Sequence, residues 1–591
     1  MAEIKKGAAT IELTAPGTGR GDQSNPTFEY VDKGKQEELR TLAKVNKVNI
    51  TTHSTPSAWG VAGFGRDGFS KAHQEETLQE VKKAIDFSSS VADGGSVVVH
   101  TGEFPRTFTS EEISQGDYQF KQYKDEDKDA MIHLVNKKNG SIISSVKKDE
   151  YIYIPVQDMN TDGSLKWLKG ENNDDVVDDI THEKIPVYKI DSATQGIEIK
   201  QVKFVDFAKE KRLADPQKYK SDDAVARDFF IQQMEARISH DLGQARQYET
   251  HYTHATRDRE EIIKQLEWMK DLRKAIKTDD EWNDLKPKLL AQVHRFTRQP
   301  GSDDPLEAMR LALVENEKEI AYGREISASG RRQALQQLED YKKHVMPIKD
   351  YALGQSAKGY AELAMYAYDR SRTTSKPITL TLENVYPQTY GSTADEIIKI
   401  IKDSRQEFAR RLVDERKFSK EDAEKKAKDH IQMTFDTGHL NMWRKHFQQK
   451  DGETPEQADV RYKKWYLGQV EKLADEGVIG HVHLADNFGY DDAHLVVGQG
   501  NVPIKEVMSI LDKHGFKNKI AVEGGFNQGR EGFHDVWSMM GSPIYGVGAG
   551  GPGWQTVHQD RHYGYAAPPM FITGGYAPGN DWKPWSETFL E

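Results

Sequence analysis

The stretch Ile431-Gln-Met-Thr-Phe-Asp436-Thr-Gly-His439 joins a short apolar run to a carboxylate and an imidazole. Short apolar runs bounded by polar residues are typical of buried strands. Seven similar runs lie at residues 9–13, 27–31, 48–52, 96–99, 378–382, 478–484 and 520–522. With residues 431–435, they predict eight strands, four near each end of the chain.

Helical periodicity fills the intervals between these runs. Apolar residues recur three and four positions apart over residues 78–85, 397–412, 460–473 and 504–511, as they do in amphipathic helices. Strands that alternate with helices are typical of a parallel sheet. The pattern predicts an α/β fold, a (β/α)₈ TIM barrel, with strands one to four in residues 1–104 and strands five to eight in residues 351–530.

One interval is too long for a single helical connection. No barrel unit is recognisable between His100 and Ile378, so residues 105–350 are predicted to form an α+β insertion after the fourth strand. Its first part has strand-like runs at 141–156 and 185–207, and its second part, 222–343, is charged and helical. Because the insertion leaves the barrel at a catalytic strand end, we expect it to cover the site as a lid or a substrate-selecting wall.

Residues 531–591 form a C-terminal tail rich in Gly, Pro and aromatic residues, which we expect to pack on the barrel. The run Gly546-Val-Gly548-Ala-Gly550-Gly551 formally matches a dinucleotide-binding fingerprint. Pro552 and Gly553 follow where the helix of that motif should begin. We therefore predict no nucleotide cofactor.

Composition excludes several kinds of site. The 591 residues include no cysteine, which excludes disulfide scaffolds, zinc fingers, iron–sulfur clusters and thiol nucleophiles. Lys and Arg number 82 against 94 Asp and Glu, a net charge of −12, so the charge does not indicate a nucleic-acid partner. No apolar signal core follows the N-terminus and no run of about 18 apolar residues occurs. We expect a cytoplasmic protein without membrane contact.

Histidines and carboxylates stand where most of the predicted strands end. They are His53, His100, Glu383, Asp436 with His439, His481 and His483 followed by Asp492 and His494, and Glu523. The carboxyl ends of barrel strands converge on one face, which is where active sites of this fold lie. Imidazole and carboxylate ligands suit Zn²⁺, Mn²⁺ or Fe, so the sequence predicts a metal centre on this face.

These residues lie in a series of short motifs: Val48-Asn-Ile-Thr-Thr-His53, Val97-Val-Val-His100-Thr-Gly102, Leu382-Glu383-Asn384, Phe435-Asp436-Thr-Gly-His439, His481-Val-His483-Leu-Ala-Asp486-Asn487, Asp492-Ala-His494 with Gly498-Gln-Gly500, and Val522-Glu523. With these motifs, the chain resembles the endonuclease IV and xylose isomerase-like TIM-barrel superfamily in residues 1–104 and 351–530; the superfamily includes AP endonuclease family 2 and sugar phosphate isomerases and epimerases. Each motif is short, and their order along the chain makes the resemblance specific.

The resemblance to endonuclease IV implies nine ligands for three zinc ions. His53 and His100 would hold the first ion, Glu383 would bridge it to the second, Asp436, His483 and Glu523 would complete the second, and His439, Asp492 and His494 would hold the third. A bridging hydroxide would then attack phosphorus. This set favours a trinuclear zinc hydrolase of phosphate esters, of the type that cleaves abasic-site DNA, as the leading hypothesis.

Two alternatives stay open. Sugar isomerases and epimerases of the superfamily need in essence Glu383, Asp436, His483 and Glu523, where the catalytic residues Glu383 and Glu523 move a proton beside a carbonyl while Zn²⁺ or Mn²⁺ polarises the oxygens. The short stretch from His483 to Asp492, Gln499 in place of the usual Glu, and the insertion favour this hypothesis and a small sugar-type substrate over DNA. The third hypothesis is a barrel reused for binding or assembly, with the insertion or the tail as an oligomer interface.

Overall fold

The computed structural model describes residues 9–21, 26–110, 113–170, 172–177, 184–192, 197–299, 301–518 and 520–523. The chain divides into two compact units, one made of Met1–Ser145 with Pro347–Glu591 and the other of Val146–Met346. The predicted tail, 531–591, and the Gly-rich run at 546–551 lie outside the described residues.

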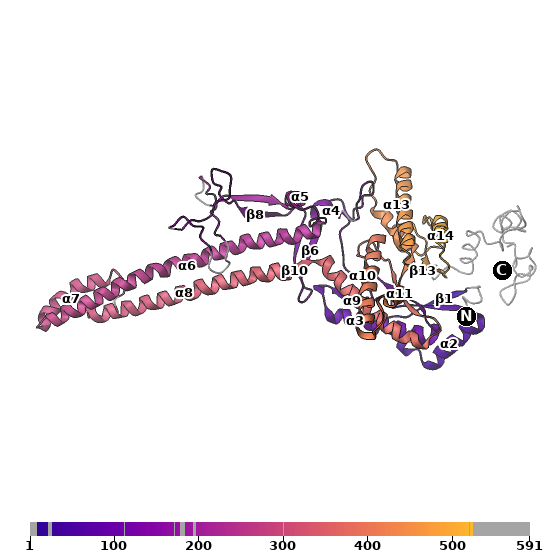
Figure 1. Ribbon diagram of the computed structural model, residues 1–591, viewed down its shortest axis with the longest axis horizontal. Coiled ribbons are helices and arrows are strands. Elements are labelled where there is room, and N and C mark those ends of the chain that lie inside the picture. Colours follow the sequence, from indigo (N-terminus) through magenta and orange to yellow (C-terminus); the bar gives the residue numbers. More distant parts are fainter. Residues whose placement is uncertain are drawn as a thin grey trace, which may run out of the picture. The chain divides into compact units, whose positions relative to one another are not determined.

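A parallel sheet of seven strands forms the centre of the first unit (Figure 1). In the order of the sheet, the strands are β1 (Thr10–Thr14), β2 (Asn49–His53), β5 (Gly95–His100), β11 (Ile378–Glu383), β12 (Ile431–Asp436), β13 (Ile479–Leu484) and β14 (Ile520–Val522). The two edge strands, β1 and β14, also contact each other, so the sheet is nearly closed. The described residues thus confirm an α/β fold with a parallel, TIM-barrel-like sheet.

Helices alternate with these strands, as the periodicity predicts. They are α2 (Lys33–Asn46), α3 (Lys71–Phe87), α9 (Ile348–Arg370), α10 (Ala394–Arg416), α11 (Lys420–His430), α13 (Pro455–Asp475) and α14 (Ile504–Lys513). Helix α10 buries Ile397, Ile401, Phe408 and Leu412 on one face. All six residues of β11 are buried, because a parallel strand is covered on both sides.

Residues 27–31, predicted as the second strand, form no strand. Phe28–Tyr30 is a turn of 3₁₀ helix, η1. The Phe28 ring packs on Phe87 of α3 at a centroid distance of 4.6 Å, and Asp32 caps α2 by accepting the Lys35 N–H. A segment that ends directly at a helix cap is too short to pair along the sheet, so this prediction was wrong. The long segment before β11 therefore follows the third strand of the sheet, β5.

Shorter elements complete the first unit. They are β3 (Phe64–Gly65), β4 (Gly68–Phe69), η2 (Ser88–Ala92), α4 (Glu126–Asp129), β6 (Met131–Asn136), η3 (Ser371–Thr373), α12 (Thr437–Asn441) and η4 (Met442–His446), while β7 (Ile142–Lys147) and β10 (Val345–Pro347) lie at the boundaries of the units. Residues 105–145, predicted as part of the insertion, group with the barrel unit. That the insertion forms a domain that covers the site stays a prediction.

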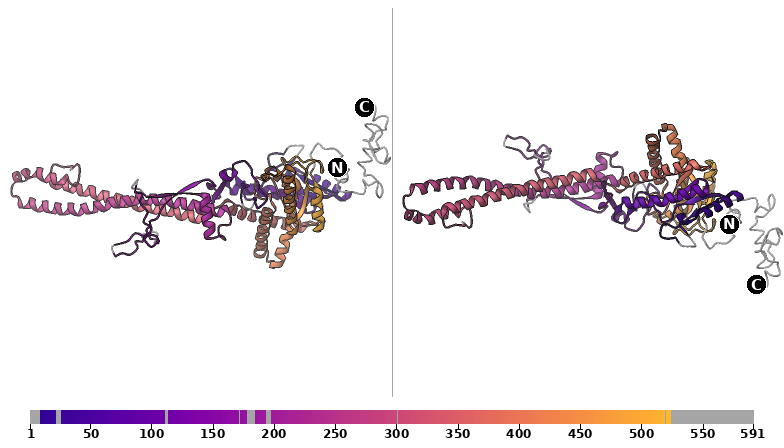
Figure 2. Two further views of the ribbon diagram at one scale, coloured as in Figure 1. Left: turned by 90° about the horizontal axis from the view of Figure 1, so that it is seen from above. Right: turned by 90° about the horizontal axis from the view of Figure 1, so that it is seen from below.

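The second unit is dominated by helices. It contains β8 (Tyr151–Pro155) paired antiparallel with β9 (Ile199–Lys203), followed by α5 (Phe204–Ala214), α6 (Asp222–Ala275), α7 (Asp279–Val293) and α8 (Pro305–His344). Helices α6 and α8 run side by side along much of their length (Figure 2). Ile262, Met269, Trp282 and Met309 belong to a buried cluster that joins α6, α7 and α8. The charged segment 222–343 is thus helical, as predicted. Among the helices that the structure describes, none is long and apolar enough to cross a membrane.

A buried carboxylate fastens α9 to the barrel. Glu103 is 1% exposed, and its Oε2 accepts the N–H of Val61 at 3.1 Å, the N–H of Ala62 at 2.9 Å and the hydroxyl of Ser356 at 2.5 Å. Its Oε1 accepts the Tyr360 hydroxyl at 2.9 Å. Burial raises the pKa of Glu103, although the four donors act against that rise.

We expect Glu103→Gln to lower the free energy of unfolding by about 2 kcal/mol, because the amide group turns N–H donors toward groups that are themselves donors. Tyr360→Phe, which removes one hydrogen bond from the same carboxylate, should cost about 1 kcal/mol. Denaturant unfolding followed by circular dichroism measures both changes. Equal midpoints for the wild type and Glu103→Gln would show that these bonds do not stabilise the fold.

Candidate metal centre

The predicted ligands close the strands of the sheet. His53 ends β2, His100 ends β5, Glu383 ends β11 and Asp436 ends β12. The register pairs His100 with Glu383, and Asp436 with His483 of β13. Because parallel strands bring their carboxyl ends to one face, these side chains meet there, as the sequence predicts.

Glu383 lies at the centre of the cluster and is 1% exposed. Its Oε2 lies 3.2 Å from Nε2 of His53 and 3.5 Å from Nε2 of His100. Its Oε1 lies 3.3 Å from Nδ1 of His439 and 3.2 Å from Nδ1 of His483. One carboxylate therefore contacts four imidazoles that come from different parts of the barrel.

Asp436, His483 and Glu523 form a group beside Glu383. Nδ1 of His483 lies 3.0 Å from Oε1 of Glu523, the residue that follows β14. Asp436 is the N-cap of α12, and its Oδ1 accepts the His439 N–H at 2.5 Å. Its Oδ2 is buried and accepts no hydrogen bond from the described part of the chain. A buried carboxylate oxygen without a donor is costly, and a cation would satisfy it.

The loop after β13 brings two further side chains to this face. Oδ2 of Asp492 lies 3.3 Å from Nε2 of His439 and 3.1 Å from Nε2 of His494. Nδ1 of His494 lies 3.4 Å from Oε2 of Glu523. All nine residues predicted from the resemblance thus meet in one cluster, while their role as metal ligands stays a prediction.

Asp486 closes the loop that presents Asp492. Its carboxylate accepts the N–H groups of Gly498 at 2.8 Å, Gly500 at 3.0 Å and Val502 at 3.1 Å. A Cβ atom at Gly500 would collide with the Asp486 carboxylate, so this position requires glycine. The Gly498-Gln-Gly500 motif therefore shapes the loop, and Asp486 acts on it through backbone hydrogen bonds.

Backbone carbonyls orient two of the histidines. Nδ1 of His53 lies 2.6 Å from the carbonyl oxygen of Ser54, and Nδ1 of His439 lies 2.9 Å from that of Asn384. A carbonyl oxygen only accepts, so Nδ1 is the protonated nitrogen in both rings. Each Nε2 then offers its lone pair, as a metal-ligating imidazole must.

The charges of the cluster depend on its burial. Burial raises the pKa of Glu383, but the imidazoles of His483, His439 and His53 outweigh it and hold that pKa well below its ordinary value. Burial raises the pKa of Asp436 to about 7, and the neighbouring Glu523 and Glu383 reinforce the rise. A group of carboxylates this close together fits a divalent cation, which would offset their mutual repulsion.

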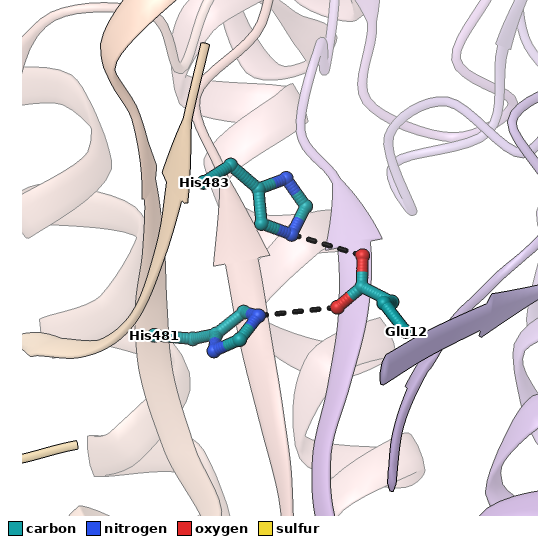
Figure 3. A group of neighbouring side chains, drawn as sticks. All are labelled: Glu12, His481 and His483. Atoms are coloured by element: carbon teal, nitrogen blue, oxygen red, sulfur yellow. Dashed lines mark hydrogen bonds and ion pairs between the residues drawn. The ribbon is translucent and has the colours of Figure 1, made fainter. Parts of the chain in front are cut away.

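Sequence reasoning missed one member of the cluster, Glu12 of β1. Its Oε1 lies 3.0 Å from Nε2 of His483, and its Oε2 lies 3.1 Å from Nε2 of His481 (Figure 3). Thr51 of β2, the register partner of Glu12, donates its hydroxyl to Oε2 at 2.9 Å. The sequence did contain a signal for Glu12, because polar and apolar residues alternate from Thr10 to Thr14. This alternation places Glu12 on the face of the strand opposite Ile11 and Leu13.

Four groups in the described residues bring at least three ligand atoms within 4.8 Å of one another. They are Glu12, His481 and His483; His53, Glu383 and His483; Glu383, Asp436 and His439; and Asp436, His483 and Glu523. Ligands about 2.1 Å from one ion lie about 3.0 to 3.4 Å from each other, which matches the separations around His483 and Glu383. These buried clusters are consistent with divalent metal binding. Asp492 and His494 belong to none of the four groups.

Two aromatic rings lie beside the cluster. The Trp59 ring contacts that of His100 at a centroid distance of 5.7 Å, and the Tyr386 ring contacts that of His439 at 5.6 Å. The two aromatic rings lie 5.0 Å apart and are both half-buried. The Tyr386 hydroxyl also reaches Oδ2 of Asp492 at 3.4 Å. Two aromatic rings therefore line one side of the cluster of candidate metal ligands.

The chain is similar to three solved structures of sugar epimerases or an epimerase-like protein. A D-tagatose 3-epimerase-like protein has a TM-score of 0.34 at 12% identity, over 90% of this chain and 88% of that one. The D-psicose 3-epimerase of Clostridium cellulolyticum H10 has a TM-score of 0.19 at 16% identity, over 31% and 45% of the two chains. The 3-keto-D-glucoside 4-epimerase of E. coli has a TM-score of 0.19 at 16% identity, over 32% and 54%.

Sequence comparison finds similarity to known proteins in the second half of the barrel. A stretch of 55 residues, 9% of this chain, is 47% identical to the uncharacterized protein MJ1311 of Methanocaldococcus jannaschii. That stretch spans about a fifth of the relative, 19% of its length. Residues 344–532 match the family model described as a xylose isomerase-like TIM barrel. The matched residues include seven of the nine side chains predicted as ligands, all but His53 and His100, and this part of the chain is similar to the xylose isomerase-like TIM-barrel family.

Proposed function

We propose that the chain is a divalent-metal-dependent isomerase or epimerase of a sugar or sugar phosphate. The observation that supports it most is the group formed by Asp436, His483 and Glu523, whose ligand atoms lie within 4.8 Å of one another with Glu383 alongside. These are the four residues that the isomerase hypothesis requires. The family match to a xylose isomerase-like barrel supports the same class of reaction.

The residues present fit one divalent ion, Zn²⁺ or Mn²⁺. Asp436, His483 and Glu523 would hold it together with Glu383, and the unpartnered Oδ2 of Asp436 is the strongest single indication. When bound, the ion would supply Lewis-acid polarisation of the substrate oxygens.

The two glutamates are suited to move a proton. Burial raises the pKa of each, but imidazoles, His483 foremost, outweigh it and leave both pKa values below the ordinary value. Both are therefore carboxylates at neutral pH. One would take a proton from the carbon beside the substrate carbonyl, and the other would return a proton to the same carbon or to its neighbour. Glu523 is 25% exposed and is the more accessible of the two.

The surroundings favour a small, ring-shaped substrate. Trp59 and Tyr386 offer apolar ring faces against which the C–H side of a sugar can pack. A net charge of −12 gives no general attraction for a long polyanion such as DNA. These features support a sugar-type substrate over an abasic-site duplex.

A trinuclear phosphate-ester hydrolase is the second candidate. It is favoured by the position of Asp492, which lies 3.3 Å from Nε2 of His439 and 3.1 Å from Nε2 of His494. Those three residues are the third-metal ligands in the endonuclease IV pattern. The two candidates therefore differ in whether Asp492 and His100 are needed.

We expect His100→Ala and Asp492→Asn each to keep at least about a tenth of the wild-type isomerisation rate, because neither belongs to the four-residue group. The full chain, loaded with Mn²⁺ or Zn²⁺, is assayed against a panel of ketoses and ketose phosphates in D₂O, and NMR follows deuterium uptake beside the carbonyl. Cleavage of abasic-site DNA or of a simple phosphodiester is measured in parallel. Phosphodiester cleavage by the wild type that both variants abolish would overturn the proposal in favour of the hydrolase.

A further inference from the structure

We propose that Glu12 is a positioning residue that acts through His483 on the metal. Its carboxylate holds Nε2 of His483, so that Nδ1 faces the metal ligands Glu383 and Glu523. This inference rests on the proposed metal site and assigns a role to a residue outside the four-residue group.

The geometry gives His483 two distinct sides. Nε2 lies 3.0 Å from Oε1 of Glu12 (Figure 3). Nδ1 lies 3.2 Å from Oε1 of Glu383 and 3.0 Å from Oε1 of Glu523. The Glu12 contact is an ion pair without an aligned hydrogen bond, and Nδ1 is hydrogen-bonded to Glu383. With a cation bound between Nδ1 and the two glutamates, the charge of Glu12 beside Nε2 would favour the ring form that carries its proton on Nε2 and offers the Nδ1 lone pair to the metal.

His483 differs in this respect from the other oriented histidines. His53 and His439 face neutral backbone carbonyls, of Ser54 and Asn384, with their second nitrogen. A carboxylate is a stronger acceptor than a carbonyl and carries a full charge. It therefore increases the electron density of the ring and the strength of its bond to a metal. His483 is also the histidine that two of the candidate ligand groups around Glu383 and Glu523 share.

Glu12 is itself held in place. Thr51 donates its hydroxyl to Oε2 at 2.9 Å, and Nε2 of His481 lies 3.1 Å from the same oxygen. His481 therefore supports the Glu12 carboxylate, and its ring also contacts that of His483 at a centroid distance of 5.1 Å.

The test measures metal affinity rather than turnover. The metal-free full chain is titrated with Co²⁺ and with Zn²⁺, and dissociation constants come from competition with a chromophoric chelator. We expect Glu12→Gln to weaken binding about 10- to 100-fold and to change the visible spectrum of bound Co²⁺, which reports on the ligand geometry. Glu103→Gln is the matched control: it alters a buried carboxylate whose hydrogen bonds come from Val61, Ala62, Ser356 and Tyr360, and it should lower stability while leaving the dissociation constant and the spectrum unchanged.

The outcomes separate this inference from the proposed function. A wild type that binds no divalent ion contradicts the metal site and the function proposed from it. A wild type that binds tightly, with Glu12→Gln equal to it in affinity and spectrum, overturns only the role of Glu12. Should Glu12→Gln fail to fold, Glu12→Asp keeps the charge but draws the carboxylate away from His483. We expect it to lose about tenfold in affinity, and unchanged affinity would overturn the inference.

Discussion

Glu523→Gln should lower the isomerisation rate by about 10⁴-fold while the chain remains folded. The substitution removes a carboxylate that faces Nδ1 of His483 at 3.0 Å and that, in the proposed reaction, would accept or donate a proton. Loss of a positioned general base or acid alone costs about 10² to 10⁴ in rate, and loss of a charged ligand adds to it. Steady-state rates and deuterium uptake by NMR, both with saturating Mn²⁺, measure the effect.

Glu506→Gln is the matched control for this variant. Glu506 lies on α14 and forms an exposed ion pair with Lys463 at 2.6 Å, away from the cluster. Breaking such a pair costs less than about 1 kcal/mol and should leave turnover unchanged. A Glu523→Gln variant that turns over as fast as the control would contradict the assignment of Glu523 as a catalytic residue.

Removal of the metal should lower the isomerisation rate by about 10³-fold, because Lewis-acid assistance lowers the activation free energy by several kcal/mol.

Removal of the metal should also change how the stability of the fold depends on pH. Asp436, with its pKa raised to about 7, holds a proton in the folded metal-free chain that the unfolded chain releases near 3.8. Its contribution to stability is therefore lost as pH rises from about 4 to 7. The pKa values of His439 and His483 are also raised, against burial, by Asp436 and Glu12 foremost, so their contribution is lost at still higher pH.

Metal binding has the opposite pH dependence. In the proposed site, the ion would displace protons from Asp436 and from the histidines, so its affinity should rise about tenfold per pH unit for each proton released. The difference in Tm between the Mn²⁺-loaded and the metal-free chain should consequently be larger at pH 8 than at pH 6. A difference that stays constant over this range would show that these groups do not titrate with metal binding.

The strand ends could be predicted from the sequence for a physical reason. A His or carboxylate at the end of a buried apolar strand lies at the carboxyl face of the barrel. The sequence pattern therefore predicts, before any distance is known, that four strand-end residues lie close together: His53, His100, Glu383 and Asp436. The helices could be predicted because their buried stripes, such as Ile397 to Leu412 in α10, recur with the helical period.

Other parts of the fold and of the site could not be predicted, because they depend on contacts between residues that a sequence pattern does not reveal. Residues 27–31 have the composition of a strand, yet Phe28 is anchored on Phe87 and Asp32 starts a helix at once. Glu12 lies inside an apolar run, and its proposed role depends on β1 and β13 approaching each other although Glu12 and His481 are 469 positions apart in the sequence. The nitrogen that each histidine presents is set by neighbours such as the carbonyl of Asn384, which only the fold reveals.

The number of metal ions per chain tests the central claim most directly. The purified full chain, saturated with Zn²⁺ or Mn²⁺ and freed of excess ion, is analysed by elemental mass spectrometry beside Asp436→Asn and Asp492→Asn. The proposed isomerase predicts one ion per chain, lost in Asp436→Asn and retained in Asp492→Asn. Three ions per chain, with one of them lost in Asp492→Asn, would contradict the single-metal site and support the trinuclear hydrolase.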